Sequence, residues 1–96
     1  NLGGLKIAPL EVEEVVMKLD FVDECLLIPT VKGNNTAIKL LVVLKEGMEL
    51  DESAIRAIIA ENLEPYKIPK TIVTVDEIIK TFNGKIDRKQ MIAKYS

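Results

Sequence analysis

Residues 25–44 read CLLIPTVKGNNTAIKLLVVL, and this stretch decides the fold. The apolar run at 25–28 predicts a buried strand over residues 22–31, and the aliphatic run after it predicts a second strand over residues 36–45. The residues between them, KGNN at 32–35, are typical of a tight turn. Because so short a connection can join only antiparallel strands, we expect a β-hairpin at the centre of the domain.

A helix is predicted before this hairpin. Pro9 suits the first turn of a helix, and apolar residues recur at positions 12, 15, 16 and 19 with helical spacing. This periodicity puts the acidic residues Glu11, Glu13 and Glu14 on the outer side, near the helix start that favours them. The sequence therefore predicts a helix with a purely apolar inner face.

The second half of the chain predicts two more helices and one strand. Asp51 is a good N-cap residue for a helix with an isoleucine stripe, and Pro65 would stop that helix. Residues 71–75, TIVTV, predict a third and fairly buried strand. Asp87, with Gln90 three residues later, predicts the capped start of a last short helix.

The predicted order is helix, strand, strand, helix, strand, helix, which indicates a small α+β fold with a three-stranded sheet flanked by about three helices. The 96 residues, 48% hydrophobic and 29% charged, fit one ordinary globular domain over residues 1–96. No apolar run is long enough to span a membrane. With one cysteine, Cys25, and no histidine, we expect no internal disulfide, no Cys/His catalysis and no metal site, and a cytoplasmic location.

Charge is unevenly distributed along the chain. The net charge is −2, but residues 67–96 carry seven basic and only three acidic side chains. This pattern fits either a solvated face or an electropositive end that meets phosphate or an acidic partner. Since the four aromatic residues are not interleaved with the basic ones, we do not expect a nucleic-acid partner.

Residues 80–89, KTFNGKIDRK, carry the most specific functional signal. Asn83-Gly84 is a strong turn signal because both residues tolerate positive φ. We expect this turn to present Lys85 at its tip, where a lone ammonium group suits an anionic ligand. Arg88 and Lys89 are expected on the exposed surface at the start of the last helix.

Three segments of the chain resemble those of the AMP-forming adenylating enzymes. Residues 3–13 are similar to the segment after the hinge in that family, residues 63–69 to its Leu-Pro-Pro-Tyr connector, and residues 80–89 to its catalytic-lysine loop. The family includes acyl- and aryl-CoA synthetases, luciferases and the adenylation domains of nonribosomal peptide synthetases. The resemblance implies that the chain, which begins at Asn1 rather than Met, is the small C-terminal lid domain of a larger ligase.

The resemblance also implies roles for individual residues. In this family a carboxylate attacks the α-phosphate of ATP, the lid then rotates, and a thiol attacks the acyl-adenylate. Lys85 would be the catalytic lysine of the first step, Gly3 and Gly4 would line the thiol tunnel in the second, and Lys6 would approach the AMP phosphate.

Cofactors and partners are implied in the same way. ATP with Mg²⁺ and coenzyme A would serve the full-length enzyme, whose large N-terminal ATP-binding domain would be the partner of this domain. The isolated lid is expected to bind none of these cofactors and to be essentially inactive. Two alternatives stay open: the lid of an adenylation domain that loads a carrier protein, and a non-enzymatic α+β regulatory or interaction module.

Overall fold

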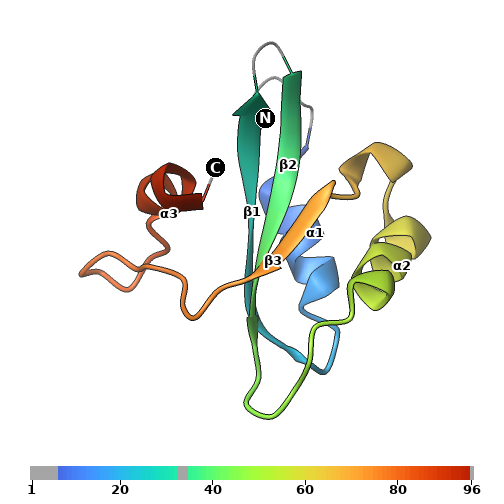
Figure 1. The fold of residues 1–96 in the computed structure, drawn as a ribbon, viewed down its shortest axis with the longest axis horizontal. Coiled ribbons are helices and arrows are strands. Elements are labelled where there is room, and N and C mark those ends of the chain that lie inside the picture. Colours follow the sequence, from blue (N-terminus) through green and yellow to red (C-terminus); the bar gives the residue numbers. More distant parts are fainter. Residues whose placement is uncertain (1–6, 33–34, 96) are drawn as a thin grey trace.

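Among the described residues, three helices and three strands make up the fold, which confirms the predicted α+β class. The computed structural model of the protein describes residues 7–32 and 35–95. The order along the chain (Figure 1) is α1 (Pro9–Val16), β1 (Val22–Lys32), β2 (Asn35–Leu44), α2 (Glu52–Asn62), the 3₁₀ turn η1 (Pro65–Lys67), β3 (Thr71–Thr74) and α3 (Arg88–Tyr95). Each predicted helix and strand is present, with boundaries that differ by a few residues.

The sheet is mixed and has the order β1-β2-β3. β1 and β2 pair antiparallel as predicted, with Leu27 opposite Leu40. β3 lies parallel to β2, with Ile72 beside Leu40, because α2 carries the chain back across one face before β3 begins. This order leaves β1 and β3 as the two edge strands.

Both faces of the sheet are covered. Helices α1 and α2 lie on one face, while α3 and the loop before it lie on the other (Figure 1). Because side chains alternate along a strand, Leu27 and Leu40 point to the first face, and Leu26 and Leu41 point to the second. The first core also contains Val12, Val16, Ile55 and Ile59, and the second contains Ile28, Ile78 and Met91.

The predicted start of α2 is confirmed. The side chain of Asp51 accepts a hydrogen bond from the backbone N–H of Ala54 at 3.0 Å, so it satisfies one of the free donors at the helix start. The helix ends at Asn62, and Leu63 is already extended two residues before Pro65. The backbone N–H of Pro65 is missing, so the chain there turns into η1 instead of continuing α2.

Candidate functional site

The predicted turn near the C-terminus is the end of a small hairpin. Lys80 and Ile86 form an antiparallel bridge, and the backbone N–H of Thr81 donates to the carbonyl of Lys85 at 2.7 Å. The N–H of Gly84 donates back to the carbonyl of Thr81 at 2.9 Å, which closes a four-residue turn. Gly84 has φ +83°, a conformation that glycine adopts at little cost.

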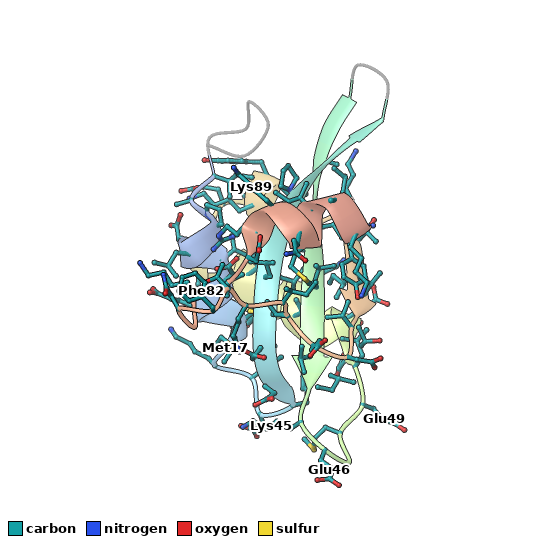
Figure 2. The ribbon with its side chains drawn as sticks, turned by 90° about the vertical axis from the view of Figure 1, so that its left-hand side faces the viewer. Met17, Lys45, Glu46, Glu49, Phe82 and Lys89 are labelled. Carbon is teal, nitrogen blue, oxygen red and sulfur yellow. The ribbon has the colours of Figure 1, made fainter. Side chains whose placement is uncertain are left out.

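The turn differs in detail from the predicted one. Of the two residues that tolerate positive φ, Gly84 takes it and Asn83 does not. The hydrogen-bonded turn spans residues 81–84, one position earlier than a turn centred on Asn83-Gly84, so Phe82 and Asn83 are its central residues and Lys85 is not at its tip. The Phe82 ring is 99% exposed and projects from the side of the molecule (Figure 2). Lys85 follows the turn on the returning arm of the hairpin.

Lys85 is exposed, and within residues 7–32 and 35–95 its ammonium group has no acidic partner. Lys80, on the opposite arm of the same hairpin, differs in this respect, because its ammonium group lies 2.6 Å from a carboxylate oxygen of Glu24 on β1. The backbone around Lys85 is held by hydrogen bonds while its charge is available to a ligand. This combination fits a residue that offers a positive charge from a defined position.

Asp87 connects the hairpin to α3. Its carboxylate accepts a hydrogen bond from the backbone N–H of Gln90 at 3.1 Å and another from the Gln90 side chain at 3.1 Å, so the predicted cap is confirmed. The backbone N–H of Asp87 donates to the carbonyl of Ile79 at 2.8 Å and so ties both arms of the hairpin together. The start of α3 and the hairpin therefore form one hydrogen-bonded unit.

A buried ion pair lies at the start of α3. Arg88 donates from Nη1 and Nη2 to the two carboxylate oxygens of Glu13 at 3.3 and 3.2 Å. The Glu13 side chain is only 8% exposed, so the prediction that it lies on the outer side of the first helix is wrong. Arg88, at 40%, is half-buried and paired, which also corrects its expected place on the free surface. Lys89 is exposed as predicted (Figure 2).

The same pair covers the free edge of the sheet. The backbone N–H of Leu27, in the middle of β1, donates to Glu13 Oε2 at 2.7 Å, and the Leu27 carbonyl accepts from Arg88 Nη1 at 3.5 Å. Edge strands carry backbone groups that face away from their neighbour and need other partners. Glu13 from α1 and Arg88 from α3 supply those partners from opposite faces of the sheet.

A second lysine is removed from the surface at the connector. Lys67 is 8% exposed, and its ammonium group lies 2.9 Å from Glu11 and 2.8 Å from Glu64. The hydrogen bonds that Lys67 donates to Glu64, and then to Glu11, raise the pKa of Lys67, and accepting the bond from Lys67 lowers the pKa of Glu64. The predicted electropositive end is therefore weaker than its charge count implies, since Lys67, Lys80 and Arg88 all have acidic partners.

An open groove of about 350 Å³ lies beside the Glu13–Arg88 pair. Cys25 is one of the residues that line it, and burial, followed by the charges of Glu13 and Glu24, raises the pKa of the Cys25 thiol to about 12. The thiol is therefore protonated and inert at neutral pH, in agreement with the predicted core position. The groove is lined by Leu10, Glu13, Glu14, Met17, Glu24, Cys25 and Ile86.

The other predicted site residues, Gly3, Gly4 and Lys6, lie outside the described residues. In the part of the chain that the structure describes, no group of three or more cysteine, aspartate or glutamate side chains comes together as a metal site could require. None of the described helices has the length and apolar character needed to cross a membrane. The site that the structure assembles is thus the hairpin with Lys85 and the buried pair beside it.

Comparison with known proteins identifies the domain type. A family profile described as "AMP-binding enzyme C-terminal domain" matches residues 11–85. The chain is 35% identical over 89 residues to 3,4-dihydroxybenzoate–[aryl-carrier protein] ligase of Bacillus anthracis, a match that covers 93% of this chain and 21% of the relative. It is 34% identical over 96 residues to 2-succinylbenzoate–CoA ligase of Listeria monocytogenes, covering 98% of this chain and 20% of the relative.

Solved structures give the same result. The fold matches a benzoate CoA ligase from Burkholderia xenovorans with a TM-score of 0.83 and 32% identity, covering 91% of this chain and 18% of that one. The chain thus spans about a fifth of the length of the curated relatives it matches. The similarity includes the hairpin up to Lys85.

Proposed function

Because this chain belongs to the family of AMP-binding enzyme C-terminal domains, we propose that it is the lid of an AMP-forming acyl- or aryl-CoA ligase. In this proposal Lys85 is the catalytic lysine of the adenylation step. The large N-terminal domain of the same polypeptide binds ATP and the carboxylic acid. The lid closes over that domain and brings Lys85 to the reacting groups.

The chemistry of the first step explains why a lysine is needed. A carboxylate and the α-phosphate of ATP are both anions, and negative charge grows on the phosphate oxygens as the new bond forms. An ammonium group between them offsets the repulsion and favours the crowded transition state over the separated reactants. A lysine acts as a compact charge on a flexible stem, so it can follow both oxyanions as they approach.

One observation carries the proposal. Lys85 is exposed and free of acidic partners among the described residues, while the hairpin that holds it is fixed by the Thr81, Gly84 and Asp87 backbone hydrogen bonds. Lys67, whose role is structural, pairs with two carboxylates, while Lys89 is exposed and, in the part of the chain that the structure describes, unpaired, but lies on α3 and not on the hairpin. Lys85 instead keeps its charge for a ligand that arrives from outside the domain.

The second step uses another part of the lid. We propose that the lid rotates after adenylate formation, that Gly3 and Gly4 then line the tunnel through which the thiol enters, and that Lys6 approaches the AMP phosphate. Glycines permit close approach of an extended pantetheine arm because they have no side chain. ATP with Mg²⁺ and coenzyme A serve the complete enzyme, which we place in the cytoplasm. The isolated lid is inactive because it holds only one of the groups that the reaction needs.

A second acceptor has support of its own. The relative from Bacillus anthracis is named as a ligase of an aryl-carrier protein, so the thiol could belong to a carrier protein instead of coenzyme A. The two acceptors are separated by offering the complete ligase either free coenzyme A or a pantetheinylated carrier protein. The preferred acceptor gives the larger kcat/KM for release of AMP.

The test of Lys85 uses the complete ligase that contains this domain. The Lys85→Ala variant should slow formation of the acyl-adenylate by about 10²–10³-fold, as expected for the loss of one transition-state charge contact. Pyrophosphate exchange measures this step. Thioester formation from supplied acyl-adenylate should change little, because the second step uses the other face of the lid.

The matched control is Lys89→Ala, which removes another exposed cation four residues away. Its adenylation rate should stay close to that of the unaltered ligase. An equal loss of both half-reactions in Lys85→Ala would show that Lys85 is structural and would overturn the assignment. An upstream sequence without an ATP-binding domain would instead favour a non-enzymatic interaction module.

A further inference from the structure

We propose that Glu13 and Arg88 form a positioning pair that sets where Lys85 is held for adenylation. This inference rests on the proposed function of Lys85. Neither residue is expected to touch the substrates, because the Glu13 carboxylate is buried and the Arg88 guanidinium is occupied by it. Both act through the hairpin, so they are positioning residues and not catalytic ones.

The mechanical connection from Arg88 to Lys85 is short. Arg88 is the first residue of α3 and follows Lys85 by only three positions. The two residues between them are both fixed, since Ile86 bridges to Lys80 and the Asp87 N–H donates to the opposite arm of the hairpin. A displacement of the Arg88 backbone should therefore shift Lys85 by a similar amount.

The connection from Arg88 to the sheet is equally direct. The two parallel bonds between the guanidinium and the Glu13 carboxylate define both a distance and an orientation, which a single contact would not. Glu13 is held in turn by the Leu27 N–H at 2.7 Å. The position of Lys85 is thus tied to the middle of β1, where Leu27 is fully buried and paired with Leu40 of β2.

The other arm of the hairpin has a weaker anchor. The Lys80–Glu24 pair joins it to β1 at 2.6 Å, but these side chains are 43% and 34% exposed. Exposed pairs contribute little because water screens the charges and two long side chains must be ordered. Arg88 is also 40% exposed, but its partner Glu13 is only 8% exposed, the pair is joined by two hydrogen bonds, and Glu13 is fixed by the Leu27 N–H, so this anchor is better defined than the Lys80 pair.

Loss of this anchor should reduce catalysis before it unfolds the domain. Without the guanidinium fork, α3 and the hairpin can tilt relative to β1, and Lys85 then samples positions away from the two oxyanions. A misplacement of about 1 Å can cost roughly 100-fold in rate. We expect Arg88→Met to lower the rate of adenylate formation by about 10–100-fold, mainly in kcat and with little change in KM for ATP.

A double-mutant cycle in the complete ligase tests the inference. If Arg88 acts only through Lys85, Arg88→Met should slow adenylation in the unaltered ligase and have no further effect in the Lys85→Ala background. A general structural defect would slow both backgrounds by the same factor. The matched control Lys89→Met removes the neighbouring cation of α3 and should leave the rate within about threefold in either background.

Two further measurements guard against a folding defect. Arg88→Lys keeps the charge but not the fork, and should give a smaller loss, about 3–10-fold, that also disappears in the Lys85→Ala background. In the 96-residue chain, hydrogen exchange of the Leu27 amide should accelerate in Glu13→Ala and not in the neighbouring Glu14→Ala, because only Glu13 accepts from that N–H.

The outcomes separate the inference from the function on which it rests. A Lys85→Ala variant with an unchanged adenylation rate would remove both. If Lys85→Ala slows adenylation but Arg88→Met slows the two backgrounds equally, the role of Lys85 stands and only the positioning pair is overturned. A loss in Arg88→Met that is confined to the background with Lys85 supports the inference.

Discussion

Replacing Glu13 by alanine removes one carboxylate and leaves three donor groups without their acceptor. The Leu27 N–H lies between two packed faces of the sheet, and leaving such a donor unsatisfied costs about 1–3 kcal/mol. The Arg88 pair adds about 0.5–1 kcal/mol, a reduced figure because the guanidinium is 40% exposed and water can replace the carboxylate. The sum is a loss of about 1.5–4 kcal/mol in the free energy of unfolding.

This loss is large for a small domain, whose total stability is about 5–15 kcal/mol. The midpoint of thermal unfolding should fall by roughly 6–30 °C. Urea unfolding followed by far-ultraviolet circular dichroism measures the change directly, and no tryptophan is needed for it. Glu13→Gln should cost about half as much as Glu13→Ala, because its amide oxygen can still accept from the Leu27 N–H.

The matched control is Glu14→Ala, which alters the next residue of α1. Glu14 is exposed and makes none of these contacts, so its replacement should stay within about 0.5 kcal/mol of the unaltered chain. The reasoning would be refuted if Glu13→Ala and Glu14→Ala unfolded at the same urea concentration. The Glu13–Arg88 pair would then make no measurable contribution to the free energy of unfolding.

Three further outcomes can be measured on the 96-residue chain. In urea unfolding, Gly84→Ala should lower the unfolding free energy by about 1–2 kcal/mol, which is the backbone strain of an alanine at φ +83°. No steric clash adds to this cost, because the new methyl group would meet no atom within 4 Å. An unchanged urea midpoint would mean that the turn adopts another shape. Iodoacetamide should alkylate Cys25 at pH 8 at least about 100-fold more slowly in the folded chain than in urea. Burial raises the pKa of the thiol to about 12, so little of the reactive thiolate is present in the folded chain. Equal alkylation rates in the two states would contradict this prediction. Lys67→Met should lower the unfolding free energy by a constant amount from pH 5 to 9. This difference should shrink as the pH falls below 4.5 through the lowered folded-state pKa of Glu64, or rises above 10.5 through the raised pKa of Lys67. A difference that persists at pH 2 would show that the packing of Lys67, and not its charge, stabilises the chain.

Local patterns were sufficient to predict most of the fold. The apolar run at 25–28 became the buried centre of β1, and Asp51 and Asp87 both cap the helices that follow them. These features depend on residues that are close in the sequence, so spacing and side-chain chemistry are enough to predict them. The parallel position of β3 was not predicted, because it depends on how α2 crosses the sheet.

The candidate site was predicted less completely. Lys85 could be singled out from its loop, but the role of Glu13 could not, because its partner Arg88 lies 75 residues away and a glutamate early in a helix has an ordinary local explanation. A usable signal was present. Glu13 lies directly beside Val12 and one turn before Val16, so the helical period puts it at the border of the apolar face, where a charged side chain needs a partner.

The turn shows a different limit. Asn83-Gly84 marks the place where the chain reverses, but the loop closes between Thr81 and Gly84, which moves Phe82 to the tip and Lys85 onto the returning arm. The dipeptide indicates a reversal without deciding how many residues take part in it. Loop length is set by the bridge between Lys80 and Ile86, which no local pattern reveals.

The side chains that cover the unpaired edge of β1 also protect the polypeptide against self-assembly. An edge strand of 11 residues with uncovered backbone N–H and C=O groups is a template for pairing with a strand of a second molecule. Glu13 and Arg88 cover that edge at Leu27, and the opposite margin of the sheet, β3, is only four residues long. Chains that lack the carboxylate should therefore be prone to stack into β-rich fibrils at high concentration, well before they lose their helices.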